Sequence, residues 1–141
     1  MFNSIDFSKL IAEEDRALTF SGVPDGVLAG LLGKLSKVSG VSGAPGAPTC
    51  QRGLVYVASD GNKLPELASA LAFFAPWLEV IELPAWDCLP YDRVSPSNSV
   101  TATRINTLGK LASPKADEAP FIVLTTANAL MQRCVPREVM K

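Results

Sequence analysis

The feature that most constrains the fold of this sequence is an alternation of short apolar runs with segments of helical periodicity. The apolar runs predict strands over 17–21, 53–59, 78–83 and 120–125. The periodic segments predict helices over 8–16, 25–37, 63–74 and 98–112, and a last short helix at the end of the chain. Asn62 is a candidate cap of the 63–74 helix, Ser97 or Asn98 of the 98–112 helix, and Thr126 of the last one. Strands that alternate with helices are typical of an α/β fold. We therefore expect a three-layer parallel sheet flanked by helices, with the 53–59 strand buried on both faces.

The length and composition suit a single domain. The chain has 141 residues, of which 48% are hydrophobic and 19% are charged, so it is able to bury a core. Segment 39–49 is dominated by glycine, alanine, proline and serine and predicts a flexible internal loop. The net charge of −1 argues against a dedicated nucleic-acid-binding domain. We expect residues 1–141 to form one α/β domain.

The absence of histidine excludes several kinds of catalytic and metal site. Without histidine there is no Ser-His-Asp triad, no Cys-His dyad and no histidine ligand or general base. Cys50, Cys88 and Cys134 are far apart, which is typical of reduced thiols in a cytosolic protein rather than of a zinc site. No run reaches the ~20 apolar residues of a membrane span, and the N-terminus lacks signal-peptide features. The sequence predicts a cytoplasmic protein without a metal or a membrane partner.

A glycine-bearing turn before the 25–37 helix has the layout of a phosphate-binding loop, in which backbone amides at a helix N-terminus face an anion. The motif G-x-x-x-x-G-K-[ST] beginning at Gly22 needs glycine, lysine and a hydroxyl at positions 27, 28 and 29. The sequence has valine, leucine and alanine there. Asp25 adds a negative charge where phosphates would lie. We interpret Gly22, Asp25 and Gly26 as a degenerate phosphate loop, and we expect no cofactor in this chain.

Residues 84–97 (PAWDCLPYDRVSPS) form the most distinctive stretch, and three interpretations of it remain open. A catalytic interpretation would use its two aspartates or Cys88, but no histidine or second carboxylate cluster is present as a partner. A packing interpretation places Trp86 in the core and lets the aspartates cap turns. The third interpretation is an exposed contact surface for a partner or for DNA, because aromatic and arginine side chains suit interfaces. Its residues are Tyr91, Arg93 and Arg104.

Three segments combine uncommon residue types in a fixed order. They are 83–96 (LPAWDCLPYDRVSP), 102–104 (ATR) with Leu108, and 122–133 (IVLTTANALMQR). In order and spacing they resemble the N-terminal part of the bacterial transcription-repair coupling factor (Mfd). A weaker similarity over 18–22 and 70–74 extends the resemblance to most of the chain outside 39–49.

The resemblance implies a RecA-like, P-loop-NTPase-derived fold, because this part of the family is similar to the first domain of the excision-repair subunit UvrB. UvrB has a working ATP site, whereas the loop of the coupling factor is degenerate, in agreement with residues 22–29. The family protein is an ATP-driven translocase on double-stranded DNA that displaces stalled RNA polymerase and recruits UvrA for nucleotide excision repair. The resemblance places its motor, with ATP and Mg²⁺, downstream of residue 141, so that this chain is a UvrB-like N-terminal fragment.

We therefore expect a non-catalytic scaffold subdomain of a coupling factor, which meets UvrA and RNA polymerase as part of the full-length protein. Two alternatives come from other functional classes. An active nucleotide-binding domain of a DNA helicase is disfavoured by the missing lysine and hydroxyl after Gly26. A DNA-binding module is disfavoured by the net charge of −1.

Overall fold

The computed structural model describes residues 19–38, 53–88, 95–112, 120–136 and 139. The elements follow one another in the order α2 (Asp25–Val38), β1 (Gly53–Ala58), the 3-10 helix η1 (Gly61–Lys63), α3 (Leu64–Phe74), β2 (Glu79–Leu83), α4 (Asn98–Ala112), β3 (Phe121–Thr126) and α5 (Ala127–Met131). The helix expected over 8–16 and the loop expected over 39–49 lie outside the described residues. From α2 to α5, the predicted alternation of helices and strands is confirmed.

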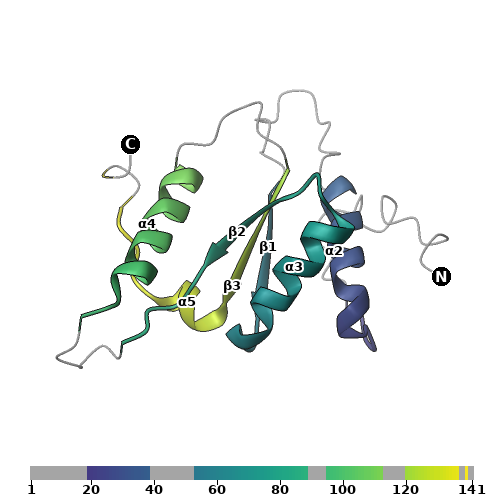
Figure 1. Cartoon of the computed structure of the whole chain (residues 1–141), viewed down its shortest axis with the longest axis horizontal. Helices are drawn as coiled ribbons and strands as arrows, with labels where there is room; N and C mark the ends of the chain where they lie inside the picture. Colours follow the sequence, from purple (N-terminus) through teal and green to yellow (C-terminus); the bar gives the residue numbers. More distant parts are fainter. Residues whose placement is uncertain (1–18, 39–52, 89–94, 113–119, 137–138, 140–141) are drawn as a thin grey trace.

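The three strands form a parallel sheet in the order β1-β3-β2. β3 pairs with both neighbours, so Leu54, Ile122 and Val80 stand side by side across the sheet. The chain passes from β1 to β2 through α3 and from β2 to β3 through α4, because parallel strands need long crossover connections. The chain is thus a mixed α/β structure whose small parallel sheet is flanked by helices, as predicted (Figure 1).

One face of the sheet carries the main hydrophobic core, which α2 and α3 cover. Ile122 and Leu124 of β3 are fully buried there, together with Leu71 of α3. α2 approaches the end of α3 so closely that a β-carbon at Gly33 would lie 2.9 Å from the β-carbon of Ala75. This contact explains a glycine inside α2, although glycine costs a helix about 1 kcal/mol relative to alanine.

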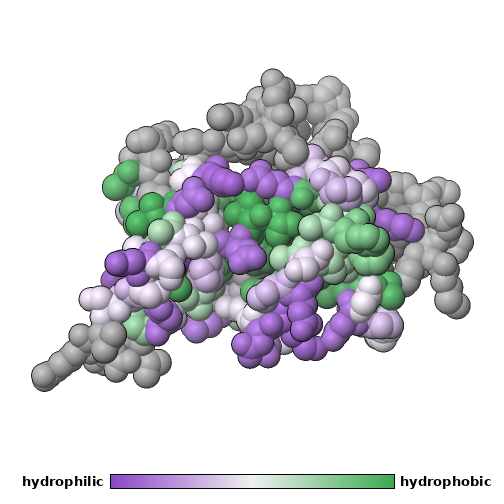
Figure 2. Space-filling view, in the orientation of Figure 1, coloured by the Kyte–Doolittle hydropathy of each residue, from purple (hydrophilic) through white to green (hydrophobic). Residues whose placement is uncertain are grey.

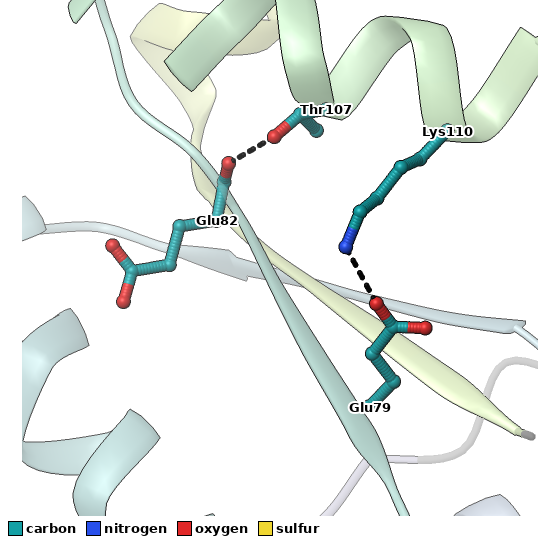
Figure 3. A network of polar contacts seen from close by, with 4 residues as sticks. All are labelled: Glu79, Glu82, Thr107 and Lys110. Atoms are coloured by element: carbon teal, nitrogen blue, oxygen red, sulfur yellow. Dashed lines mark hydrogen bonds and ion pairs between the residues drawn. The ribbon is translucent and has the colours of Figure 1, made fainter. Parts of the chain in front are cut away.

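The opposite face of the sheet is covered by α4, which lies along β2. Lys110 binds the Glu79 carboxylate at 2.7 Å, and the buried Thr107 hydroxyl donates to the main-chain oxygen of Glu82 at 2.7 Å (Figure 3). Beneath the helix, Ile81 of β2 is buried. Because successive strand residues point to opposite faces, Glu79 and Ile81 face α4 while Val80 faces the main core. The sheet is therefore the middle of three layers.

The outer face of β1 differs from the expectation of a strand buried on both sides. Val55 and Val57 are 61% and 44% exposed, although Val123 and Thr125, their neighbours in β3, are buried. The reason is the position of α4, whose contacts with the sheet are chiefly with β2. The β-branched composition of β1 indicated a strand correctly but did not indicate which neighbour covers it.

The strand expected over 17–21 is not formed in the part of the chain that the structure describes. Thr19, Phe20 and Ser21 are exposed and belong to no strand, and residues 17 and 18 lie outside the described ranges. The chain then turns into α2 through Gly22, whose φ of 69° suits glycine because it has no β-carbon.

Side-chain caps fix where the helices begin. The Ser97 hydroxyl accepts a hydrogen bond from the backbone N–H of Val100 at 3.4 Å, and the Thr126 hydroxyl accepts one from Ala129 at 3.2 Å. Both were predicted as capping positions, and such caps satisfy backbone donors that have no partner within the helix. Asn62 does not cap α3, because it lies within η1, where its backbone N–H donates to the capping Asp60 carboxylate; the N-cap of α3 is Lys63, which makes no side-chain capping hydrogen bond.

Some apolar surface of the described chain remains in contact with solvent. Figure 2 shows hydrophobic surface gathered in the middle of its view, between the side that carries α4 and the side that carries α3. The exposed large apolar side chains include Val55, Val57, Phe73, Phe74, Ile105 and Met131. None of the described helices has the length and hydropathy needed to cross a membrane.

Candidate functional site

The three distinctive sequence segments meet around one arginine. Arg104 lies in α4 and is only 1% exposed. Its guanidinium donates hydrogen bonds to the main-chain oxygen of Pro84 and to Oε1 of Gln132, the latter at 3.3 Å. Arg104 thereby connects α4 with the chain that follows β2 and with the chain that follows α5.

Trp86 and Cys134 complete this cluster. The Arg104 guanidinium carbon lies 4.6 Å from the centre of the Trp86 ring, within the range of a cation–π interaction. The Trp86 backbone N–H donates to Oε1 of Gln132 at 2.8 Å, and Nη2 of Arg104 lies 3.9 Å from Sγ of Cys134. We call Pro84, Trp86, Arg104, Gln132 and Cys134 the Arg104 cluster.

Among the described residues, the hydrogen-bond acceptors around the Arg104 guanidinium are uncharged. The ion pairs of the described residues do not include Arg104, and its Nε has no hydrogen-bond partner among them. A buried cation without a counter-charge costs free energy, so stacking, neutral dipoles and packing hold the side chain in place. The cluster offers a fixed guanidinium that joins three segments, but it holds no carboxylate or imidazole that could act as a general base.

The expectation of an exposed Arg104 was therefore wrong. Its side chain points into the molecule because the helical stripe of α4 that faces β2 also includes the buried Thr107. Tyr91 and Arg93, expected in the same patch, lie outside the described residues, and their partner-contact role stays a prediction. Gln132 was not predicted as part of a site, since a single uncharged amide after a short helix carries no spacing signal.

Asp87 also links the two segments that flank residues 89–94. Its carboxylate accepts a hydrogen bond from the backbone N–H of Ser97, with distances of 3.1 and 3.3 Å to its two oxygens. The contact with Ser97 holds the pKa of the Asp87 carboxyl below its usual value of 3.8, because the hydrogen bond favours the charged form. Asp87 and the Arg104 cluster therefore hold together the two chain ends that flank 89–94.

Replacing Asp87 with alanine is expected to lower the midpoint of urea unfolding at neutral pH and to have a smaller effect in acid. Because the pKa is lower in the folded state, the stabilisation is present above the ordinary value of 3.8 and is lost as pH falls through the folded value. Urea unfolding of both proteins from about pH 7 down to about pH 2 measures this difference. A difference that stays constant over the whole range would contradict the role of the carboxylate. Asp87→Asn, which keeps an acceptor oxygen but no charge, is the control.

Two of the three residues interpreted as a degenerate phosphate loop lie beside a cavity. Asp25 and Gly26, at the start of α2, line a cavity of about 280 Å³ between α2, α3 and the end of β1. The Asp25 carboxylate binds Nζ of Lys63 at 2.8 Å, and this hydrogen bond raises the pKa of Lys63. The basic residue at this site therefore comes from η1 and already has an acidic partner, a pairing that sequence spacing did not reveal.

A second cavity, of about 500 Å³, lies at the carboxyl ends of the strands, the edge where open α/β sheets commonly bind ligands. Its polar lining includes Asp60, Glu82, Thr126 and Asn128, and none of the described residues that line it is a lysine or an arginine. Within the described ranges, no group of three or more histidine, cysteine or acidic side chains is placed to hold a metal ion. The charged side chains among the described lining residues at this edge of the sheet are thus acidic.

The sequence is similar to those of curated coupling factors. It is 28% identical over 88 residues to the transcription-repair-coupling factor of Rickettsia bellii (strain RML369-C), which covers 62% of this chain and 8% of the relative. The transcription-repair-coupling factors of Mycobacterium bovis and Mycobacterium tuberculosis are each 32% identical over 93 residues, which covers 62% of this chain and 7% of the relative. This chain is related to the transcription-repair coupling factors. The resemblance inferred from the three segments is thereby confirmed.

The coupling factors that match are much longer than this chain, which spans 7–8% of their length. Their name describes a coupling of transcription to repair, and this activity is that of the whole relatives. No family model matches the sequence, and no solved structure matches it. The similarity therefore concerns a small part of each of these relatives.

Proposed function

We propose that this chain acts as a non-catalytic scaffold domain of a cytoplasmic transcription-repair coupling factor, which displaces stalled RNA polymerase and recruits UvrA. The observation that carries the proposal is the Arg104 cluster. It ties together the segments that resemble the coupling factors, and it contains no general base. A buried arginine held by main-chain and amide oxygens suits a structural role, because it fixes neighbouring segments without performing chemistry.

Within this proposal, Tyr91 and Arg93 make the contact with UvrA or RNA polymerase. The support comes from both sides of 89–94, where Asp87 binds Ser97 and Arg104 binds Pro84. A contact segment that is fixed at both ends loses less conformational entropy on binding than a free one. In the longer protein, the motor supplies the contacts with double-stranded DNA and uses ATP and Mg²⁺.

We further propose that the fold derives from a RecA-like P-loop NTPase and that its phosphate loop is degenerate. The parallel sheet with crossover helices and the turn at Gly22 before α2 support this origin. Asp25 supports the loss of function, since its carboxylate lies at the helix end where phosphate would bind and already pairs with Lys63. The chain then needs no cofactor of its own.

Titration of Mg-ATP into the full chain is expected to give no saturable heat up to about 1 mM, because residues 22–29 lack the lysine and hydroxyl of the motif and Lys63 is already paired with Asp25. Isothermal titration calorimetry makes the measurement, with inorganic phosphate as a second titrant. Saturable binding tighter than about 100 μM, or about −5.5 kcal/mol, would support the alternative of an active nucleotide-binding domain.

Capture of purified UvrA or RNA polymerase by the immobilised chain is expected to weaken by about tenfold when Tyr91 and Arg93 are both replaced with alanine. Large aromatic and arginine side chains often carry most of the affinity of an interface, which is the reason for the size of the effect. Arg133→Ala is the control, because it removes an exposed arginine outside 89–94. Equal capture by the double variant and the control would show that Tyr91 and Arg93 do not take part in the contact. Salt-sensitive capture of DNA instead would favour the DNA-binding alternative.

A further inference from the structure

The cavity between α2 and α3 has an apolar floor and a charged rim. Leu28 of α2, Tyr56 of β1 and Leu67 and Ala70 of α3 form part of the floor. Leu28, Tyr56 and Ala70 are only partly buried, so the core does not close over them. With about 280 Å³, the cavity is close to the lower limit of small-molecule sites. Since an apolar cavity of roughly 150 Å³ holds a benzene ring, this one has room for a ring with a short side chain.

The charges at the rim select the sign of a ligand. Asp25, Asp60 and Glu66 contribute three carboxylates, and Lys63 contributes one ammonium group that Asp25 already binds at 2.8 Å. The remaining carboxylates, those of Asp60 and Glu66, give the described lining residues a net charge of −2. The dipoles of α2 and α3 offset part of this negative charge, because the N-terminus of each helix carries about half a positive charge. The sum is roughly −1, which favours a cation over an anion.

We propose that this cavity binds a small organic cation with an apolar body, such as an arylalkylamine. The apolar part would occupy the floor beside Tyr56 and Leu67, and the ammonium group would lie at the rim toward Asp60 and Glu66. No chemical step is involved, and the inference does not depend on the role of the chain in a coupling factor.

The test compares three probes of similar shape that differ in charge. These are 2-phenylethylamine, neutral 2-phenylethanol and anionic phenylacetate, each titrated into the full chain and followed by amide chemical shifts in NMR spectra. The amine is expected to saturate with a dissociation constant of about 1 mM, since few atoms make contact. Its shifts should centre on Leu28, Tyr56 and Leu67. The alcohol should bind at least about threefold more weakly and phenylacetate about tenfold more weakly.

Two variants separate the contributions of the rim and the floor. Asp60→Asn with Glu66→Gln is expected to weaken binding of the amine by about fivefold and to leave the alcohol unchanged, because only the charge is removed. Glu79→Gln with Glu82→Gln is the matched control, since it removes two carboxylates that do not line this cavity. Ala70→Leu is expected to abolish binding of both probes by filling the floor.

Several outcomes would overturn the inference. Equal affinity for the amine and the alcohol would show that the rim does not select charge, and tighter binding of phenylacetate would show a site for anions. Shifts confined to residues outside the cavity would place the binding elsewhere. If the control variant lost as much affinity for the amine as the rim variant, the net charge of the protein, and not the carboxylates at the rim, would explain the weaker binding.

Discussion

Replacing Arg104 with alanine is expected to lower the free energy of unfolding by about 3 kcal/mol. The substitution removes a side chain that is 1% exposed and leaves the main-chain oxygen of Pro84 and Oε1 of Gln132 without this donor. An acceptor left unsatisfied in the interior costs about 1–3 kcal/mol, and the empty volume beside Trp86 adds to the loss. Urea unfolding followed by the fluorescence of the two tryptophans measures the change.

Two further variants show which part of the arginine matters. Arg104→Met keeps most of the volume and removes a buried cation that has no acidic partner among the described residues, so it is expected to cost less than the alanine variant. Arg133→Ala, at an exposed position, is expected to change the free energy of unfolding by less than about 0.5 kcal/mol. A loss below about 1 kcal/mol for Arg104→Ala would show that the cluster does not hold the three segments together.

Replacing Leu71 with alanine is expected to lower the free energy of unfolding by about 3 kcal/mol. Leu71 is fully buried in the cluster that joins α3 to Ile122 and Leu124 of β3. Truncation of a buried leucine loses transfer free energy and leaves a cavity, which together cost about 2–5 kcal/mol. Equilibrium unfolding in urea measures the loss, and an unchanged slope with denaturant shows that unfolding stays cooperative.

Phe73 provides the matched control on the same helix. It lies two residues from Leu71 but is 79% exposed, and its ring contacts that of Phe74 edge to face at 5.1 Å. Phe73→Ala is therefore expected to cost less than about 1 kcal/mol, since little apolar surface returns to water. Similar losses for Leu71→Ala and Phe73→Ala would contradict the assignment of the core to the face of α3 toward the sheet.

Local signals in the sequence predicted most of the elements and two of the helix starts. The helical periodicity predicted α2, and the hydroxyls of Thr126 and of Ser97, one of the two candidate caps of α4, accept capping hydrogen bonds. The order β1-β3-β2 was not predicted, because periodicity shows which face of a strand is apolar but not which strand lies beside it. The exposure of Val55 and Val57 depends on that order and on the position of α4, so the sequence did not reveal it.

The sequence by itself determined the types of the elements, the mismatch of residues 22–29 with the phosphate-loop motif and the relationship with the coupling factors, because each of these depends on neighbouring residues or on their order. Only the tertiary structure decided that Arg104 is buried, since its acceptors lie 20 and 28 positions away in the chain. The same holds for Lys63, which finds Asp25 across 38 positions and places an ion pair at the start of α2. Such contacts follow from how helices lie on the sheet, and no local pattern of residues encodes that arrangement.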